Sequence, residues 1–267
     1  MRRELVPDEL WSLVEPVIPK WTPSPKGGKP RLEDRRAFTG ILFVLKTGIP
    51  WEDLPQEMGC GCGMSCWRRL REWMENGTWD AMHRVLLDKL RANGKLDFDL
   101  SVIDSASVRA VYGGSCTGRN PTDRGKRGSK HHVLVDGEEG APVATEVTGA
   151  NRHDVTQLEP LVNKVPPIAG KVGHPKEKPS VIQGDRAYGS KPHKERLNKR
   201  GIKTLLAQRN TEHGSGLGTT RWIVVERTLA WMHQYRRLRV RYEKRGDIHA
   251  VLLLVSAIHI CFKLLML

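Results

Sequence analysis

The stretch Phe98-Asp-Leu-Ser-Val-Ile-Asp104-Ser-Ala-Ser-Val108 marks the point where the chain changes from helical to strand-like sequence. Its apolar and polar residues alternate, which is typical of a β-strand. Asp104 follows the apolar pair Val102-Ile103, where a strand would leave the core. We therefore predict a strand that carries a carboxylate just past its most apolar part.

Strand-like and helical segments alternate after this strand. Residues 131–135 and 142–147 flank the turn residues 136–140, which predicts a hairpin. Asp154 follows as the expected N-cap of a helix. The later segments are predicted as strands at 181–183 and 202–207 and as helices at 193–199, 222–235 and 247–265. This order predicts an α/β fold with a mixed sheet flanked by helices.

The first part of the chain has helical periodicity instead. Four amphipathic segments are expected, and the third carries Arg68, Arg69 and Arg71. Short helices, tight turns and arginines on the third helix favour a small all-α, helix-turn-helix-like domain that reads DNA. A plain helical bundle with a polar surface is the alternative. We place the domains at residues 1–95 and 96–267.

The charge of the chain is its most unusual global property. Its 267 residues include 44 Lys and Arg against 30 Asp and Glu, a net charge of +14. Such a surplus favours a polyanionic partner, because cations near phosphates release condensed counterions. Ribosomal and membrane-surface proteins share this property. The basic residues concentrate in two clusters, at 119–130 and 236–245, which fit a long groove better than two solvated faces.

Nothing in the sequence indicates export. The N-terminus lacks the apolar core of a signal peptide, and His259 and Lys263 interrupt the apolar run 251–267. That run is expected to be a buried helix rather than a membrane span. Five cysteines, an odd number at low density, fit a reducing compartment. We expect a cytoplasmic protein.

Three acidic residues need an explanation in so basic a chain. Asp104 and Asp185 each follow an apolar run, and Glu226 follows Ile223-Val224-Val225 near the start of a helix that would aim it at the sheet. Converging carboxylates raise each other's pKa unless cations balance them. Each aspartate could equally be a helix cap or a turn residue.

Oxygen ligands of this kind favour Mg²⁺ or Mn²⁺. Two such ions can activate the attacking oxygen and stabilise the leaving oxygen of a phosphodiester. Three carboxylates, two metal ions and a polyanionic partner together predict phosphodiester cleavage.

Six motifs in the same order give the chain a resemblance to the insertion sequence five family of bacterial DDE transposases, over almost its whole length. The motifs are Gly28–Arg31 with Gly40–Pro55, Cys66–Leu70, Val102–Ser105, Asn120–His132, Gly184–Tyr188 and Arg221–Thr228. The resemblance implies a ribonuclease H-like catalytic domain with Asp104, Asp185 and Glu226 as the catalytic and metal-binding carboxylates. It also implies Mg²⁺ or Mn²⁺ as cofactor and recognition of the terminal inverted repeats of the element.

The chain departs from this family around its third acidic residue. The family often has a Tyr and an Arg shortly before the Glu and a Lys seven residues after it. Here Thr219 holds the tyrosine position, Arg221 lies five residues before Glu226, and position 233 is His. On a continuous helix, Glu226, His233 and Arg237 would share a face, so Arg237 is a candidate phosphate contact. Glu243 is the alternative third carboxylate.

Double-stranded DNA, as element ends and target, is the expected partner, with a homodimer at least in the DNA-bound state. The residues expected to contact DNA are Arg68, Arg69, Arg71, Arg124, Lys126, Arg127, Lys130, Arg221, Arg227, His233, Arg236 and Arg237.

Other candidate sites carry weaker patterns. Cys60, Cys62 and Cys66 suggest zinc, but a glycine-rich turn with buried thiols fits their spacing better. The pairs 131–132 and 153–154 resemble metal ligands, although structural or DNA-contacting roles are favoured. Tyr188 could be a nucleophile, but packing against the second acidic motif or contact with the substrate strand is favoured.

Three functions follow. The first is transposition, in which hydrolysis at the element ends gives a 3′-OH that attacks target DNA. The second is a DNA-binding regulator, an inactive or domesticated copy without catalysis. The third is a host nuclease of the same fold, which the absence of flanking inverted repeats would distinguish.

Overall fold

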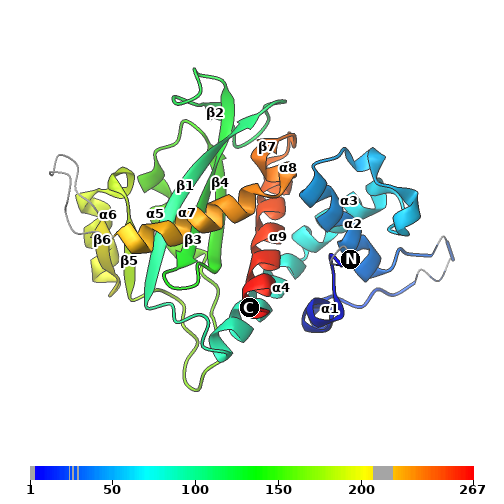
Figure 1. The fold of residues 1–267 in the computed structure, drawn as a ribbon, viewed down its shortest axis with the longest axis horizontal. Helices are drawn as coiled ribbons and strands as arrows, with labels where there is room; N and C mark the ends of the chain where they lie inside the picture. Colours follow the sequence, from blue (N-terminus) through cyan, green and yellow to red (C-terminus); the bar gives the residue numbers. More distant parts are fainter. Residues whose placement is uncertain (1–3, 24, 26, 29, 207–218) are drawn as a thin grey trace.

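The computed structural model of the protein describes residues 4–23, 25, 27–28, 30–206 and 219–267, and for residues 219–222 the backbone alone. A group of helices lies beside a curled sheet with helices of its own (Figure 1). The long helix α9, Gly246–Leu265, stands between the two parts.

Strand β1, Leu100–Ala110, is at the centre of the sheet. It pairs antiparallel with β3 on one side and parallel with β5 on the other. β4 extends the sheet antiparallel beyond β3, and β6 extends it parallel beyond β5. The bounds of these strands and of the two short ones, β2 and β7, are β2 Gly118–Arg119, β3 Arg127–Asp136, β4 Pro142–Gly149, β5 Val181–Gly184, β6 Lys203–Leu206 and β7 Val240–Arg241. The order β4-β3-β1-β5-β6 is that of a ribonuclease H-like sheet, so the predicted fold class is confirmed.

The predicted hairpin is the turn between β3 and β4. β3 is buried at every position except Arg127 and Lys130, as expected for a strand with neighbours on both sides. Asp136 ends it, and its carboxylate accepts hydrogen bonds from the amides of Glu138 and Glu139 at 3.1 Å each. This carboxylate satisfies turn amides that the strands leave unpaired.

Four helices form the N-terminal part, as predicted: α1 Asp8–Val14, α2 Asp34–Thr47, α3 Gly63–Glu75 and α4 Thr78–Ala92. Phe38, Trp73 and Trp79 join α2, α3 and α4 through edge-to-face contacts with ring centroids 5.0 to 6.3 Å apart. Gly63 starts α3 against the backbone of Trp51, where a Cβ atom would lie 1.6 Å from the Trp51 carbonyl oxygen. Only glycine allows so close an approach.

Helix α9 is long and apolar enough to cross a membrane, yet 78% of its 18-residue apolar window is buried inside the protein. It packs against α4 on the helical side and against β4 on the sheet side. One hydrophobic cluster consequently extends from Val6 to Leu264. The terminal run is a buried core helix, as expected, and the domain boundary at residues 95 and 96 stays a prediction.

Helix α7, Thr219–His233, crosses the sheet and packs on β1 and β3 (Figure 1). The chain then turns into the short helix α8, Arg236–Arg239, rather than continuing the same helix. The other short elements are α5 Leu158–Asn163, α6 Lys191–Lys199 and the 3₁₀ turns Glu15–Val17, Trp51–Asp53, Gln56–Met58, Asp154–Gln157 and Arg186–Tyr188.

The expectation that Asp154 caps a helix is wrong. His153 holds the N-cap position, and Asp154 begins a 3₁₀ turn ahead of α5. The Asp154 carboxylate instead accepts hydrogen bonds from Ser105 on β1 and Lys130 on β3. Side chains on two strands, rather than the amides of a local helix, therefore hold the Asp154 carboxylate.

Replacing Leu252 by alanine will test how far stability depends on α9. Leu252 is fully buried on that helix, so the change is expected to cost about 2–5 kcal/mol of unfolding free energy. Leu267→Ala is the control, since Leu267 is 90% exposed and its loss should cost less than about 0.5 kcal/mol. Urea unfolding measures both. Equal effects would contradict a core position for α9.

Candidate active site

The pairing of β1 with β5 brings Asp104 and Asp185 together. Ile103 lies opposite Gly184 in the parallel ladder, so the next residue on each strand is an aspartate. Asp104 lies in the middle of β1, which continues to Ala110, while β5 ends at Gly184. The two carboxylates therefore lie at the carboxyl end of β5, beside the middle of β1.

Both aspartates are held by backbone amides. Asp104 Oδ1 accepts from the amide of Ser105 at 2.7 Å, and Asp185 Oδ1 accepts from the amide of Ala187 at 2.9 Å. Asp185 thereby caps the 3₁₀ turn Arg186–Tyr188.

The electrostatics of Asp104 show that further carboxylates lie nearby. Burial, together with the charges of Asp185, Asp154 and Glu226, raises the pKa of Asp104 to about 7, although the hydrogen bond from Ser105 acts in the opposite direction. The pKa of Asp185 is also raised, first by burial and then by the charge of Asp154. Carboxylates that cannot all ionise cheaply form a site for a cation.

Glu226 reaches this region from α7. It is the eighth of 15 residues in that helix, so it lies in the middle of α7 rather than near its start, and its side chain is exposed. Two carbonyl groups of the turn between β3 and β4 hold the helix in place: Thr228 Oγ1 donates to the carbonyl of Gly140 at 2.7 Å, and Arg227 Nη2 donates to that of Glu139 at 3.0 Å.

Asp154 is a fourth carboxylate at the site, which the sequence did not identify as such. Ser105 Oγ donates to it at 2.5 Å, and Lys130 Nζ lies 2.9 Å from both of its oxygens. Burial opposes its ionisation, but these two partners outweigh burial and lower the pKa of Asp154. Asp154 follows β4 closely, so the rule that selected Asp104 and Asp185, an acid shortly after an apolar strand, could have found it.

Two buried polar atoms beside the carboxylates have no hydrogen-bond partner in the described part of the chain. They are Tyr188 Oη and His132 Nδ1. The charges of Asp154, Asp104 and Asp185 act on Tyr188, whose pKa burial raises well above its usual value. A buried tyrosine with a raised pKa is a poor nucleophile, so Tyr188 packs the motif, as favoured from the sequence.

The donor set fits a hard divalent cation. Its donors are carboxylate oxygens, burial disfavours their charged forms, and the orphaned Tyr188 hydroxyl could bond a hydrated ion. In the described residues, however, no three Asp, Glu, His or Cys side chains lie close enough to hold one metal ion.

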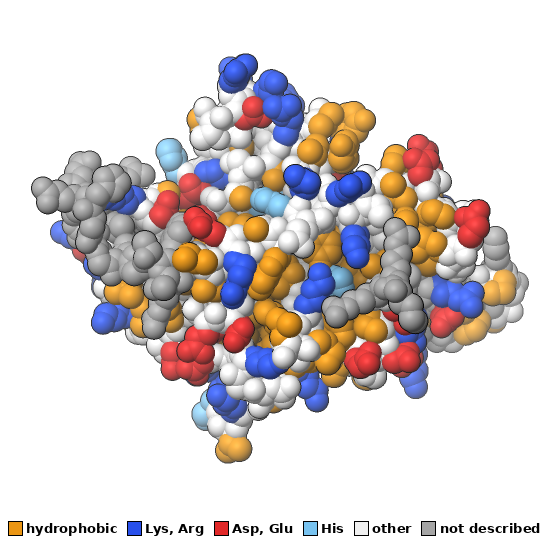
Figure 2. All heavy atoms as spheres, in the orientation of Figure 1, with side chains coloured by type: hydrophobic (Ala, Val, Ile, Leu, Met, Phe, Trp, Pro, Cys, Tyr) orange, Lys and Arg blue, Asp and Glu red, His pale blue; other side chains and the backbone are white. Residues whose placement is uncertain are grey.

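The basic turn before β3 is exposed. Arg124, Lys126 and Arg127 all project into solvent, and Lys and Arg side chains gather over the outer end of β2 and β3 (Figure 2). Asp123 pairs with Arg109, at 3.0 Å, and so does not neutralise these three. The structure leaves this predicted cluster available to a polyanion.

Two arginines predicted to contact DNA are turned inward. Arg69, 5% exposed, pairs with Asp34 and Glu72. Arg237, 7% exposed, pairs with Glu243 at 2.7 Å. Both have structural partners that occupy the guanidinium, so the DNA-binding surface proposed below omits them.

Arg237 does not share a helical face with Glu226 as predicted, because α7 ends at His233 and Arg237 belongs to α8. Glu243 is buried against Arg237 and His249, and is not the third carboxylate of the site.

The remaining predicted contacts vary in exposure. Arg68 and Arg236 are exposed, and Arg227 is exposed with its guanidinium over Trp231. Arg71 lies over Trp67 and pairs with Glu75, and His233 is half-buried beside His131. The side chain of Arg221 lies outside the described residues.

The cysteine cluster is not a zinc site in the described structure. Cys60 and Cys66 are buried, and Cys66 Sγ donates to the carbonyl of Cys60 at 3.2 Å. Cys62 is exposed and contacts Ser65. Both thiols are buried, as the favoured interpretation expects, but only Cys60 lies in the glycine-containing turn, because Cys66 belongs to α3.

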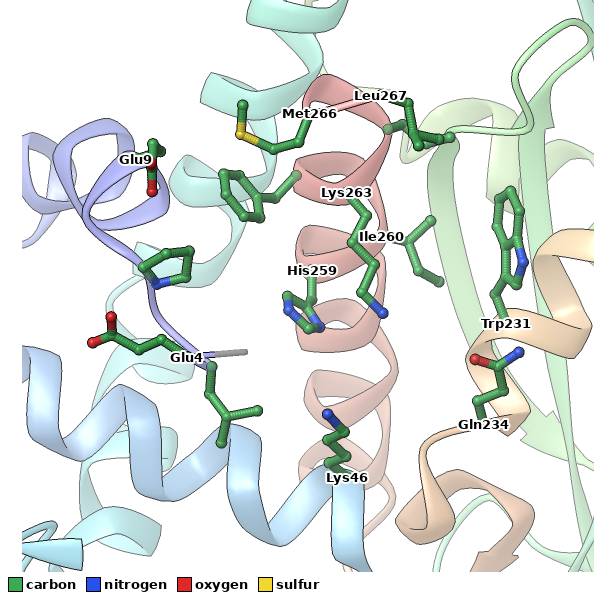
Figure 3. Close-up of a pocket in the computed structure, with 14 residues that line it drawn as sticks. Glu4, Glu9, Lys46, Trp231, Gln234, His259, Ile260, Lys263, Met266 and Leu267 are labelled. Atoms are coloured by element: carbon green, nitrogen blue, oxygen red, sulfur yellow. The ribbon is translucent and has the colours of Figure 1, made fainter. Parts of the chain in front are cut away.

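A cavity of about 670 Å³ lies away from the carboxylates, between the N-terminal segment, α7 and α9. Lys46 and Lys263 extend into the same space, and it is bordered by Trp231 of α7 and by Gln234, which directly follows that helix (Figure 3). Its lining contains none of Asp104, Asp185 and Glu226.

A ribonuclease H-like sheet with acidic residues on adjacent central strands and on a helix across them defines the polynucleotidyl transferase and nuclease class. Residues 95–261 match the family of transposase DDE domains, and residues 6–83 match the IS4/5 family of transposases. The chain belongs to the DDE transposases of insertion sequences.

Two proteins of an insertion element are similar in sequence to this chain. The transposase for insertion sequence element IS402 of Burkholderia cepacia is 52% identical over 154 residues, which cover 58% of this chain and 72% of the relative. An uncharacterized 16.2 kDa protein of the same element and organism is 50% identical over 123 residues, 45% of this chain and 84% of the relative. The solved Mos1 transposase paired-end complex with left transposon end is 11% identical, with 82% of each chain covered and a TM-score of 0.26. The fold assignment therefore rests on the strand order.

Asp104→Asn is expected to stabilise the metal-free protein increasingly as pH rises. Because burial and neighbouring charges raise the Asp104 pKa from 3.8 to about 7, the folded protein holds a proton that the unfolded chain has released. Wild-type stability therefore falls between about pH 4 and pH 7, and the variant escapes this loss. Thermal unfolding in EDTA at pH 5 and pH 8 measures the margin.

Asp99→Asn is the control. The hydrogen bond from Lys176 lowers the pKa of Asp99, so the ionised carboxylate stabilises the folded protein, and its loss is expected to lower stability at both pH values. A margin for Asp104→Asn that is the same at both pH values would contradict the site electrostatics.

Proposed function

We propose that this transposase cleaves DNA at the ends of its element and joins the resulting 3′-OH to target DNA, with Asp104, Asp185 and Glu226 as the catalytic carboxylates. The observation that supports this most is the position of Asp104. It occupies the central strand, and the charges of two further strand-end acids and of Glu226 act on it.

Mg²⁺ or Mn²⁺, as two ions, is the proposed cofactor, and Asp104, Asp185 and Glu226 would hold it. When bound, the metal supplies Lewis-acid activation of the phosphodiester and neutralises developing charge. The three carboxylates stand further apart than the ligands of a single ion, so metal binding has to draw their side chains together.

Residues around the carboxylates orient them and the substrate. The ammonium group of Lys130 lies beside Asp154 at the site, where it would meet a substrate phosphate. Asp154 and the carbonyl of Arg152 hold that ammonium at 2.9 Å. Asp154 therefore acts as a positioning residue, in contact with Lys130 and with Ser105 next to Asp104.

The proposed DNA surface starts from this site and follows the exposed cations. It includes Lys130, the turn residues Arg124, Lys126 and Arg127, and the exposed Arg227 and Arg236. Arg68 on α3 is the exposed arginine that the N-terminal part contributes from the predicted reading helix. Double-stranded element ends and target DNA are the proposed partners, with a homodimer on DNA in the bacterial nucleoid.

A regulator without catalysis is the second function that the sequence left open. All carboxylates of the proposed site are present and lie near one another, which favours the enzyme over an inactive copy. The assay that follows separates the two.

Asp185→Asn is expected to abolish cleavage and keep DNA binding. Losing one carboxylate of a metal-holding set removes several kcal/mol of transition-state stabilisation, which is at least about a hundredfold in rate. Single-turnover nicking of a labelled duplex with the element's own ends, in Mg²⁺ and in EDTA, measures it. Asp99→Asn is the matched control, because Asp99 is an exposed aspartate directly before strand β1, which carries Asp104. Metal-dependent nicking that survives in Asp185→Asn would contradict the assignment, and binding without wild-type cleavage in Mg²⁺ or Mn²⁺ would favour the regulator.

Alanine at Arg124, Lys126 and Arg127 together is expected to weaken DNA binding and its salt dependence. If each cation neutralises one phosphate, the slope of log K against log salt falls by about 3, because each contact contributes about 0.9. Lys191, Lys194 and Lys199 on α6 give a control variant with the same charge change at the other edge of the sheet. Anisotropy titrations from 50 to 200 mM salt would refute the surface if both triple variants lost the same slope.

A further inference from the structure

A chain of buried polar side chains begins at the end of α2. Arg237 Nη1 donates to the carbonyl oxygens of Ile49 at 2.8 Å and Gly48 at 3.3 Å. Its Nε donates to Glu243 Oε1 at 2.7 Å, and Glu243 Oε2 lies 3.4 Å from His249 Nδ1 on α9. Both carboxylate oxygens are therefore used inside the protein.

The chain continues through two more histidines to α7. His249 Nε2 lies 2.8 Å from His131 Nε2 on β3, and His131 Nδ1 lies 3.3 Å from His233 Nε2. His131 and His249 are fully buried, and His233 is the last residue of α7. Five side chains thus connect the N-terminal helices to the helix that carries Glu226.

Only one arrangement of protons satisfies every contact when the three histidines are neutral. Burial lowers the pKa of each of the three, so each carries one ring proton at neutral pH. The partners of Glu243 lower its pKa against burial, so Glu243 is an acceptor and His249 must donate from Nδ1. His131 then donates from Nε2 and His233 from Nε2, and all protons point towards Glu243.

Such a chain costs desolvation and is not needed to fill the core. Burying an ion pair often stabilises no more than apolar residues of the same volume, while its fixed geometry can specify one arrangement of the surrounding elements. The elements in question are α2, α8, α9, β3 and α7: α2 packs on α8 and α9, and α7 packs on β3, α8 and α9. Glu226 lies two helical turns from His233, about 10 Å along α7.

We propose that Arg237, Glu243, His249, His131 and His233 form a positioning chain that fixes α7, and with it Glu226, relative to β3 and to the N-terminal helices. This inference rests on the proposed catalytic role of Glu226. None of the five is a catalytic residue. They act by setting where the third carboxylate stands when the N-terminal part has bound DNA.

The proton arrangement can be measured without any variant. Two-dimensional ¹⁵N NMR of the ring nitrogens in the full-length protein should show His131 and His233 protonated at Nε2 and His249 at Nδ1. A different tautomer at His131, or a doubly protonated ring there at pH 7, would overturn the chain.

Glu243→Gln gives a sharper signature. The guanidinium of Arg237 has only hydrogen-bond donors, so the new amide oxygen turns to Arg237 and the amide NH₂ faces His249. His249 must then accept at Nδ1, and the protons of His131 and His233 are expected to move to Nδ1. A tautomer change two residues along the chain is not expected from a local packing defect. Unchanged tautomers at His131 and His233 in a folded variant would overturn the proposal.

His131→Phe tests the consequence for α7. The phenyl ring keeps most of the volume and removes both hydrogen bonds. Hydrogen exchange at the α7 amides is expected to quicken by about tenfold or more, and single-turnover cleavage to fall by about 10- to 100-fold with unchanged affinity for element ends. His83→Gln is the matched control, because His83 is equally buried but bonds the carbonyl of Pro142 instead of α7.

Exchange in α7 that is the same in His131→Phe as in wild type would overturn the positioning role. A wild-type protein that binds DNA without cleaving it would count against the proposed function only, since the exchange and tautomer measurements need no activity. If His131→Phe does not fold, the tautomers of Glu243→Gln still decide.

Discussion

The geometry of the site depends on the pairing of β1 with two strands of opposite direction. An antiparallel neighbour supplies the hairpin and the basic turn, and a parallel neighbour brings the end of β5 beside the middle of β1. Asp104 is consequently held at the centre of the sheet, where ionisation is costly, and Asp185 is carried to its side by the ladder register. A shift of one residue in that register would point the Asp104 side chain to the other face. The catalytic proposal therefore rests first on backbone hydrogen bonds and only then on the acids.

The second constraint is α9, which packs on α4 and on β4 at once. Because the same apolar helix is part of both cores, the helical part and the sheet cannot move independently without exposing its side chains. That rigidity gives the buried Arg237–His233 chain a purpose: polar contacts define angles that an apolar helix face leaves adjustable. The apolar packing of α9 is therefore expected to determine the free energy of unfolding. The buried polar chain is expected to determine the orientation of α7, which hydrogen exchange and the histidine tautomers report.

Periodicity and motif order were sufficient to predict most elements, including the hairpin, α2, α9 and the strands that carry Asp104 and Asp185. They failed where a polar side chain has a distant internal partner. Arg69 and Arg237 have the same local sequence character as exposed arginines, yet Asp34 and Glu243 pair with them. Asp154 was read as a helix cap because its neighbours in the sequence suggest one, whereas Ser105 and Lys130, from two other strands, determine its position. Sequence spacing reports local geometry, and these partners are brought together only by the sheet.

Part of the positive charge of the chain is consequently buried and is not available to a polyanion. Some of these buried cations hold the exposed cations in position. Arg241 is 1% exposed, and its guanidinium donates to the carbonyl oxygens of Ser115 and Cys116 and to Ser129 Oγ. These contacts fix the loop before β2 against the start of β3, immediately beside the basic turn. A cation without a direct carboxylate partner there costs desolvation, which hydrogen bonds to carbonyl dipoles offset. The buried arginine thus holds the base of the turn that presents Arg124, Lys126 and Arg127, and it serves the proposed DNA surface only through the position it gives to these exposed cations.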